Sequence, residues 1–509
     1  MTLAADRQIR STDSIFRPAL LLMSGRIMAF AATSFIPVIL AGIFDRAEFG
    51  TYKQLFLIYT TVFLIAQIGM SSSLYFFLPR FASEAGRFVA NSALCLAASG
   101  LACLGFLALG GPWLARWFSN PGLEPYMIWI GLFLSLMMVS SLLEIVMVSR
   151  GRYLWASVSY ALSDLTRAAA LIIPALIVAR LDAVLKAAVG VAALRAGAMM
   201  WYLRREFGGG LRPDAGLLKR QLLYALPFGM AVVVEIAQSN LHQYAVSHRF
   251  DPATFAVYAV GCVQIPFVDF VANPTSDVMM VKMQERLAEG RQEAVLRIWH
   301  ETTRKLALLF FPLAGFLAAA AKEMIVFAFP KYAASAPVFA VWSAGVMLAV
   351  FQIDGVLRVY AETRFLLAMN LMRLAIIASL VGWFLSEFYL LGAVLVTMLA
   401  ALAGKAAALI RIKKLLCADF AGVLPWRNLA AVWCAAIAAA TIAMAAKPHL
   451  PLATGRNLPT FTALAATAGI YGAAYAAMLW HFGLLRKEEK LAVTGWFRQA
   501  VGAAARAFS

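Results

Sequence analysis

Polar and ionisable side chains recur at helical spacing inside two long apolar stretches of this sequence. The stretch 222–247 carries Glu235, Gln238, Ser239 and His242, and the stretch 255–278 carries Asp269, Asn273, Ser276 and Asp277. Positions i, i+3, i+4 and i+7 share one face of a helix. A carboxylate removed from water without a cation can take up a proton or a cation. We therefore predict an ion-coupling site formed by Glu235, Asp269, Asp277 and His242.

The polar stripe is repeated earlier in the chain, without its carboxylates. Gln67 and Ser71 stand 206 residues before Asn273 and Asp277. We predict that Gln67 and Asn273 contact a transported substrate. The alternative for all these polar residues is hydrogen bonding to neighbouring helices, which is common in membrane bundles.

Two arginines inside apolar stretches are suited to bind an anion. Arg26 lies about two helical turns into the stretch 19–43, and Arg373 in 365–386 has no acidic residue within one turn. The guanidinium fork matches phosphate oxygens, so we predict Arg26 and Arg373 as substrate contacts. The alternative for Arg26 is extension to the membrane surface. Arg167 follows Asp164 by one turn, which favours a local ion pair, and for Arg195 we expect a structural role.

Acidic residues end two apolar stretches at matching places. Glu144 and Asp354 are 210 residues apart, and basic residues follow each of them. We predict an interlobe gate of ion pairs that exchange partners, formed by Glu144, Asp354, Arg152 and Arg364. A static, charge-satisfied helix end is the alternative.

Composition indicates that these residues sit in a polytopic membrane protein. Hydrophobic residues make up 62% of the chain, charged residues 14%, and the mean hydropathy is +0.79. A transmembrane helix needs about 20 apolar residues. About fourteen stretches meet that length: 19–43, 54–78, 88–110, 124–148, 154–178, 182–203, 222–247, 255–278, 305–329, 333–357, 365–386, 388–410, 429–446 and 460–482. The predicted fold class is all-α.

A duplicated motif divides these helices into two lobes. Residues 44–52 (FDRAEFGTY) and 250–258 (FDPATFAVY) are one pattern written twice, 206 residues apart. We predict two pseudo-symmetric six-helix lobes at 1–208 and 209–416, followed by an extra helix pair and a cytoplasmic tail at 417–509. Duplicated transporters place their substrate site between the repeats, near the middle of the bilayer.

The net charge of +18 reflects membrane orientation rather than nucleic-acid binding. Most of the 44 Lys and Arg residues fall in alternate loops on one side, which predicts that both termini are cytoplasmic. The five cysteines include no CxxC pair, so we expect neither a metal site nor a disulfide framework. We expect residues 282–305, in one of the basic segments, to form an amphipathic helix at the membrane surface.

The run 44–52, together with 222–228 and 250–258, resembles the polysaccharide transporter family, within the multidrug/oligosaccharidyl-lipid/polysaccharide exporter superfamily. The resemblance covers about residues 14–416, although Ala256 stands where Gly50 is found in the first copy. It implies a V-shaped pair of lobes that work by alternating access. It also implies that the substrate is a polyprenyl pyrophosphate carrying an oligosaccharide.

These observations predict a flippase of the bacterial inner membrane that moves a lipid-linked oligosaccharide outward for surface polysaccharide assembly. We expect no enzymatic activity and no cofactor. We expect transport to be coupled to a proton or sodium gradient. Expected partners are the lipid-linked oligosaccharide, membrane lipids and polysaccharide polymerase machinery, but no nucleic acid. A cation-coupled multidrug exporter is the first alternative. A membrane glycosyl polymerase is the second, although the outward loops are too short for its catalytic loop.

Overall fold

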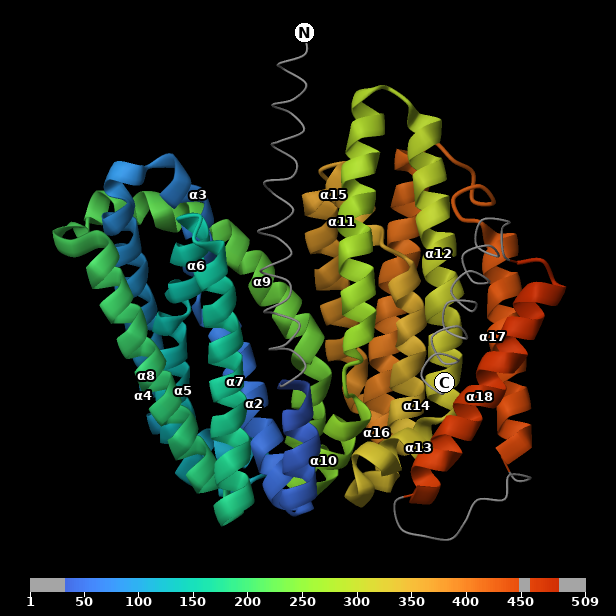
Figure 1. The fold of residues 1–509 in the computed structure, drawn as a ribbon, viewed down its shortest axis with the longest axis horizontal. Coiled ribbons are helices and arrows are strands. Elements are labelled where there is room, and N and C mark those ends of the chain that lie inside the picture. The colour runs from blue at the N-terminus through green and yellow to red at the C-terminus, as the bar shows by residue number, and fades with distance from the viewer. Residues whose placement is uncertain (1–32, 448–457, 485–509) are drawn as a thin grey trace, which may run out of the picture. The chain divides into compact units, whose positions relative to one another are not determined.

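The computed structural model describes residues 33–447 and 458–484. Arg26, most of the stretch 19–43 and the tail after residue 484 therefore lie outside the described residues. Within the described ranges every regular element is helical, as Figure 1 shows. The predicted all-α fold class is confirmed.

Contacts group the chain into two compact units. Among the described residues, unit 1 comprises 33–259 and 374–393. Its helices are Thr33–Ile43, α2 (Arg46–Ala66), α3 (Met70–Arg80), α4 (Ala85–Trp117), α5 (Met127–Ser140), α6 (Leu142–Ser149), α7 (Tyr153–Val178), α8 (Leu181–Phe207), α9 (Ala215–Arg249) and most of α10 (Pro252–Gly261). Helix α5 packs against both α4 and α8, and α7 packs along α8.

Unit 2 comprises, within the described ranges, residues 260–373, 394–447 and 458–484. Its described helices are α11 (Pro266–Ala288), α12 (Gln292–Ala319), α13 (Ala321–Ala328), α14 (Ala336–Ala344), α15 (Ile353–Val359), the two ends of α16 (Thr363–Leu415), α17 (Trp426–Ala446) and α18 (Leu458–His481). Grouping by contacts is a different criterion from the repeat, so lobe boundaries at 208 and 416 stay a prediction.

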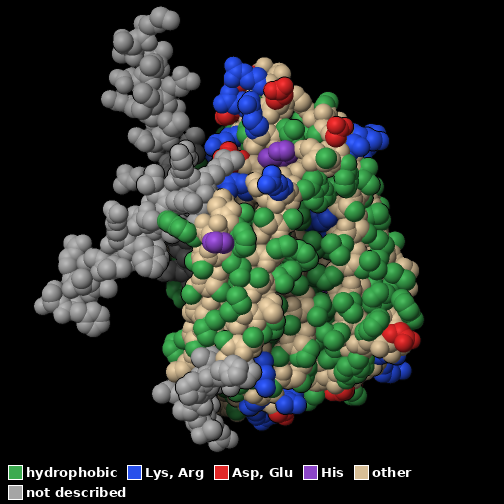
Figure 2. Space-filling view, turned by 90° about the vertical axis from the view of Figure 1, so that its right-hand side faces the viewer, with side chains coloured by type: hydrophobic (Ala, Val, Ile, Leu, Met, Phe, Trp, Pro, Cys, Tyr) green, Lys and Arg blue, Asp and Glu red, His purple; other side chains and the backbone are tan. Residues whose placement is uncertain are grey.

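The described helices are long and apolar enough to cross a membrane many times. Eleven of the described helices pass this test, or twelve if α10 and α11 are counted together as one span. The number fourteen is not reproduced, because α16 counts once and the stretch 19–43 is largely undescribed. Helix α16 breaks at Tyr389 (φ 54°), next to the predicted boundary between two spans. On the face drawn in Figure 2, hydrophobic side chains form a broad band between charged ends.

The duplicated motif starts a helix in both copies. Asp45 Oδ1 accepts a hydrogen bond from the Glu48 N–H (2.8 Å), which caps α2. Asp251 accepts from the N–H groups of Ala253 and Thr254, and so caps α10. An aspartate at this position satisfies donors that a helix start leaves unpaired.

The two copies of the motif also touch each other within unit 1. A Cβ added to Gly50 would overlap the backbone carbonyl of Pro252. The aromatic residues of the motif are buried beside this contact, with Phe49 and Tyr258 both 0% exposed. The glycine is therefore required by the close approach of two backbones.

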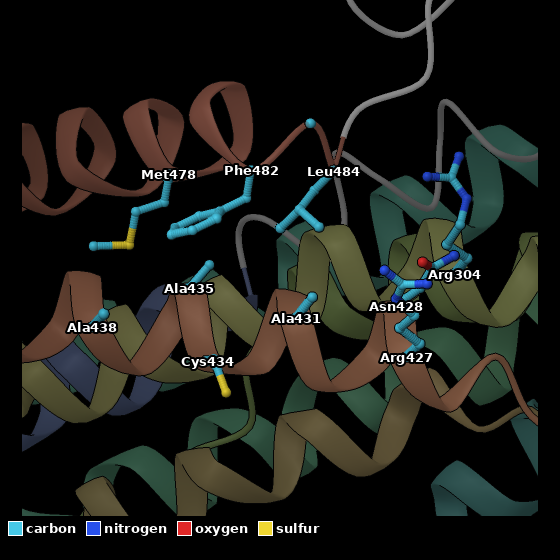
Figure 3. Close-up of a pocket in the computed structure, with 11 residues that line it drawn as sticks. Arg304, Arg427, Asn428, Ala431, Cys434, Ala435, Ala438, Met478, Phe482 and Leu484 are labelled. Atoms are coloured by element: carbon cyan, nitrogen blue, oxygen red, sulfur yellow. The ribbon is translucent and has the colours of Figure 1, made fainter.

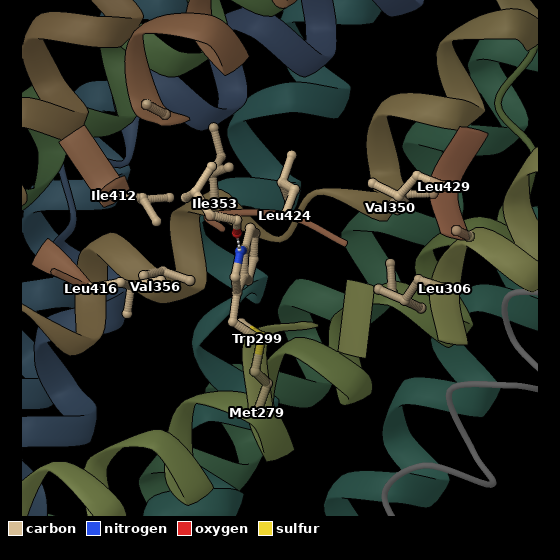
Figure 4. Close-up of a cluster of buried hydrophobic side chains, with 14 of the residues drawn as sticks. Met279, Trp299, Leu306, Val350, Ile353, Val356, Ile412, Leu416, Leu424 and Leu429 are labelled. Carbon is tan, nitrogen blue, oxygen red and sulfur yellow. Dashed lines mark hydrogen bonds between the residues drawn. The ribbon is translucent and has the colours of Figure 1, made fainter. Parts of the chain in front are cut away.

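The predicted surface helix at 282–305 is wrong. Helix α11 ends at Ala288 and α12 begins at Gln292, with Gly290 at φ +70° between them. A positive φ suits glycine and stops a helix. Trp299 is fully buried in the core of unit 2, and its Nε1 donates to the Val423 carbonyl (2.8 Å), as Figure 4 shows.

The last two helices are an integral part of unit 2. Helix α17 packs along α12, and α18 packs on α17. The Tyr475 hydroxyl donates to the Leu308 carbonyl (3.1 Å), and Lys447 Nζ donates to Glu323 Oε2 (2.8 Å). These contacts fix the pair to α12 and α13.

Candidate functional site

A buried ion-pair network lies inside unit 1. Glu144 on α6 is 1% exposed, and its Oε2 lies 2.8 Å from Arg195 Nη2 on α8. Its Oε1 accepts from the hydroxyls of Ser159 (2.9 Å) and Ser163 (3.3 Å) on α7. A charge at membrane depth is costly unless it is paired, and this one has a cation and two hydroxyl donors. The network is neutral and links α6, α7 and α8.

The arginines predicted to face Glu144 have another partner. Arg152 Nη2 lies 2.6 Å from Glu206 Oε2, and Arg150 Nε lies 3.8 Å from Glu206 Oε1. This joins the N-terminus of α7 to the end of α8. In unit 2, Glu362 at the N-terminus of α16 pairs with Arg411 near its end (2.5 Å). Unit 1 therefore joins α7 to α8 through one glutamate and two arginines, and unit 2 joins the two ends of α16 through one glutamate and one arginine.

A second cluster of ionisable groups lies inside unit 2. Lys405 Nζ donates to the Phe351 carbonyl (2.6 Å), and Asp354 and Arg373 both lie within electrostatic reach of the ammonium group. Arg373 packs on the neighbouring turn, since a Cβ added to Gly404 would come within 2.8 Å of Arg373 Cδ. Asp354 is exposed, and no hydrogen bond or ion pair among the described residues engages its carboxylate. Asp354, which was predicted as a gate residue, and Arg373, which was predicted as an anion contact, therefore both lie near Lys405.

The two clusters occupy matching positions in the duplicated sequence. Asp354, Arg373 and Lys405 each stand 210 residues after Glu144, Ser163 and Arg195, respectively. The first cluster has one acid and one base. The second has one acid and two bases, because an arginine replaces a serine. Both copies therefore have an acid at the first position (Glu144 or Asp354) and a base at the last (Arg195 or Lys405). The second copy has a further basic residue at Arg373.

The predicted polar stripe on α11 is exposed. Asp269, Asn273 and Asp277 are all exposed in unit 2. The stripe runs beside α15, where a Cβ added to Gly355 would lie 2.8 Å from Ser276 Oγ. Carboxylates on a span avoid lipid and face water or protein. We therefore expect this face of α11 to line an aqueous space.

The predicted polar face of α9 is divided between two environments. Glu235 and Ser239 are exposed, whereas Gln238 and His242 are buried. His242 Nδ1 lies 2.6 Å from the hydroxyl of Tyr258, a residue of the duplicated motif. Glu235 and His242 therefore do not share one surface, and His242 takes part in the packing of α9 on α10.

The remaining predicted residues lie apart from these clusters. Gln67 is half-buried at the end of α2, where Ile68 and Gly69 have positive φ and interrupt the span before α3. Arg364 is exposed in the first turn of α16. Arg26 lies outside the described residues. The predicted local pair is confirmed: Arg167 Nη2 lies 2.8 Å from Asp164 Oδ1.

Lys405 was not identified from the sequence, and Arg195 was not identified as the partner of Glu144. Lys405 is a lone lysine in an apolar stretch, a signal that was available in the sequence. The partnership of Glu144 with Arg195 spans 51 residues, and only the offset of 210 could have indicated it. Among the described residues, no group of His, Cys, Asp and Glu side chains could hold a metal ion.

Comparisons with solved structures place this fold among flippases and exporters. The lipid II flippase MurJ in an inward closed conformation matches with a TM-score of 0.70 and 11% identity, over 91% of this chain and 99% of that chain. An inward-facing MATE family multidrug transporter matches with a TM-score of 0.56 and 13% identity, over 78% and 98%. The Vibrio cholerae MATE transporter VcmN in the bent form gives 0.52 and 13%, over 80% and 98%.

Sequence comparison gives the family. No curated protein matches the chain. The model of a family described as "Polysaccharide biosynthesis protein" matches residues 39–336, which is more than half of the chain. The resemblance carried by the duplicated motif is thereby confirmed. The chain belongs to the polysaccharide biosynthesis protein family and is a multi-pass membrane protein with the helical fold of MurJ and the MATE transporters of the MOP superfamily.

Proposed function

We propose that this protein is a flippase that carries a polyprenyl-pyrophosphate-linked oligosaccharide across the bacterial inner membrane by alternating access. The product would serve surface polysaccharide assembly, such as O-antigen, exopolysaccharide or capsule. Both termini would be cytoplasmic, and polymerase machinery would receive the product. The carrying observation is that two basic residues, Arg373 and Lys405, lie near each other in unit 2 at positions that match Ser163 and Arg195 of unit 1.

The charge balance of the two clusters supports an anionic substrate. In unit 1, Arg195 is neutralised by Glu144 at 2.8 Å. In unit 2, Asp354 and Arg373 both lie within electrostatic reach of Lys405. Both basic residues lie in membrane-spanning segments, and a pyrophosphate carries the opposite charge to both of them. Arg373 would supply a planar fork of donors and Lys405 a compact charge.

The exposed acidic stripe supports ion coupling in the same protein. Glu235, Asp269 and Asp277 are exposed on helices that cross the membrane. We propose that they take up protons or sodium ions from an aqueous space. Gln67 and Asn273 would contact the substrate, as would Arg26. Glu144, Asp354, Arg152 and Arg364 remain a proposed gate, in which Glu144 would have to leave Arg195.

A cation-coupled exporter of small amphipathic drugs is the second candidate. The observation that favours it is the same acidic stripe, because an exposed carboxylate can bind a cationic drug. The two candidate functions differ in which charged residues of the protein bind the substrate. A flippase of an anionic lipid depends on Arg373 and Lys405, whereas a drug exporter depends on Asp269 and Glu235.

The test is flipping of a fluorescent lipid-linked oligosaccharide in proteoliposomes. We expect Arg373→Gln and Lys405→Gln each to slow flipping by at least about tenfold, the effect of one lost charge-assisted contact. Lys405→Arg should retain most of the rate. Arg167→Gln is the matched control, since Arg167 is also inside a span but is paired locally. Wild-type rates in both cluster variants, or export of drugs alone, would contradict the proposal.

A second measurement isolates the coupling ion. Glu235→Gln with Asp269→Asn should abolish stimulation of flipping by an imposed proton or sodium gradient. Basal flipping should persist, because the isosteric amides keep the volume of both side chains. Gradient stimulation that survives in this double variant would show that coupling lies elsewhere.

A further inference from the structure

An amphipathic groove lies between α17 and α18 of unit 2. It encloses about 770 Å³, within the size range of small-molecule sites. Figure 3 shows α17 along one wall and the side chains of α18 pointing toward it from the other. The cluster at Asp354, Arg373 and Lys405 contributes no residue to this groove.

Small side chains create the space along one wall. Ala431, Ala435 and Ala438 recur on one face of α17 and line the groove. Met478 of α18 and Phe482, the residue that follows α18, face them, and Phe482 is 67% exposed. A long, flexible apolar group fits a wall of this kind, because alanines leave a channel and methionine adapts its shape.

Basic and polar side chains close one end of the groove. Arg304 of α12, Arg427 and Asn428 lie together there, at the opposite end from Ala438 and Met478 (Figure 3). Arg304 is only 5% exposed, so its guanidinium is held by the protein rather than free to move in solvent. The basic end adjoins the segment 411–428, on the side where basic loops are concentrated. Basic pockets between membrane helices on the cytoplasmic side suit anionic lipid headgroups.

We infer that this groove binds one anionic glycerophospholipid of the surrounding membrane. Its phosphate contacts Arg304 and Arg427, and Asn428 donates to a headgroup oxygen. One acyl chain lies along Ala431, Ala435 and Ala438. The argument is charge complementarity: a basic end and an apolar channel on a membrane-spanning helix pair match the two ends of such a lipid. The inference does not depend on what the protein transports.

The test is lipid binding to the delipidated full-length protein, measured by native mass spectrometry with phosphatidylglycerol and with phosphatidylcholine. We expect one site that prefers phosphatidylglycerol. Arg304→Gln with Arg427→Gln should weaken that site about thirtyfold, the sum of two charges near a membrane surface. Because Arg304 is buried, the exposed Arg427→Gln is measured alone as well, with about a fivefold loss expected.

Matched controls separate the groove from general basicity. Arg286→Gln with Arg291→Gln removes one arginine from the last turn of α11 and one at the start of α12 in the same unit, and should leave the site unchanged. Ala431→Phe should fill the channel and abolish binding. Ala430→Phe, at the adjacent exposed position that does not line the groove, should not.

Three outcomes would overturn the inference. The first is equal affinity for the two phospholipids. The second is an equal loss in the control arginine variants. The third is displacement of phosphatidylglycerol by inorganic phosphate alone or, at lower concentration, by a polyprenyl phosphate, which would assign the groove to a free anion or to the carrier lipid. Flipping measurements are separate, so failure here leaves the proposed function standing.

Discussion

The buried pair in unit 1 makes a quantitative prediction about stability. Replacing Glu144 by glutamine removes the counter-charge of Arg195, which lies 2.8 Å away with 17% of its side chain exposed. Breaking a buried pair by removing one partner costs about 3–5 kcal/mol. Since Arg195 keeps slight solvent access, we expect the lower end, about 3 kcal/mol. The two serine hydroxyls can still donate to the amide oxygen.

Replacing both partners should restore most of this loss. Glu144→Met with Arg195→Met leaves no uncompensated charge, and such swaps are often neutral. We expect the double variant to unfold within about 1 kcal/mol of the wild type. The assay is thermal denaturation of purified protein in detergent, followed by size-exclusion chromatography. At roughly 2–4 °C per kcal/mol, the single variant should melt about 6–12 °C lower.

The result that refutes this reasoning is equally specific. An unchanged melting temperature for Glu144→Gln would show that Arg195 does not need its partner. A double variant as unstable as the single one would show that packing, rather than charge, holds α6 on α8. Arg195→Met alone is the reciprocal control, because it leaves the buried carboxylate without its cation.

Three further predictions concern other parts of the chain. Gly50→Ala should lower folded yield sharply, by about 3 kcal/mol or more of stability, since its Cβ overlaps the Pro252 carbonyl; normal yield would contradict the backbone contact. A cysteine at Arg212 should react with an impermeant thiol reagent only in opened cells and one at Ser119 in intact cells; equal labelling would contradict the predicted orientation. Burial acts to raise the pKa of Asp251, but its hydrogen bonds from the Thr254 hydroxyl and neighbouring N–H groups lower the pKa overall. Its stabilising effect should therefore be present above about pH 4 and be lost as pH falls through the lowered pKa, which thermal melts of wild type and Asp251→Asn should show as converging curves.

The duplicated motif shows how far sequence reasoning reaches. Apolar length predicted the helical membrane fold, and the structure adds that Asp45 and Asp251 of the repeated motif each cap a helix. These features depend on residues close together in the chain. The sequence shows a glycine at position 50 of the motif, but it does not show that another backbone segment packs against it. Its cause, the Pro252 carbonyl, required the fold.

The candidate site was predictable only in part, for physical reasons. Glu144 lies close to Arg150 and Arg152 in the sequence, yet its partner is Arg195, because α6 packs against α8. Arg150 and Arg152 pair with Glu206 instead. Helical spacing correctly grouped the α11 stripe. It wrongly united Glu235 with His242, since the i and i+7 positions of a long helix can face different neighbours.

The path of the chain through unit 1 has a consequence for how the protein is made. Unit 1 includes residues 374–393, which follow the whole stretch 260–373 of unit 2. Within unit 1, Arg249 Nη1 donates to the Gly382 carbonyl (3.3 Å), and the rings of Phe250 and Tyr389 lie 4.8 Å apart. A chain inserted into the membrane as the ribosome makes it gains these contacts only after residue 389 has emerged. The earlier helices of unit 1 therefore remain only partly assembled while residues 260–373 of unit 2 are synthesised. A nascent chain released at residue 373 would lack the last segment of unit 1.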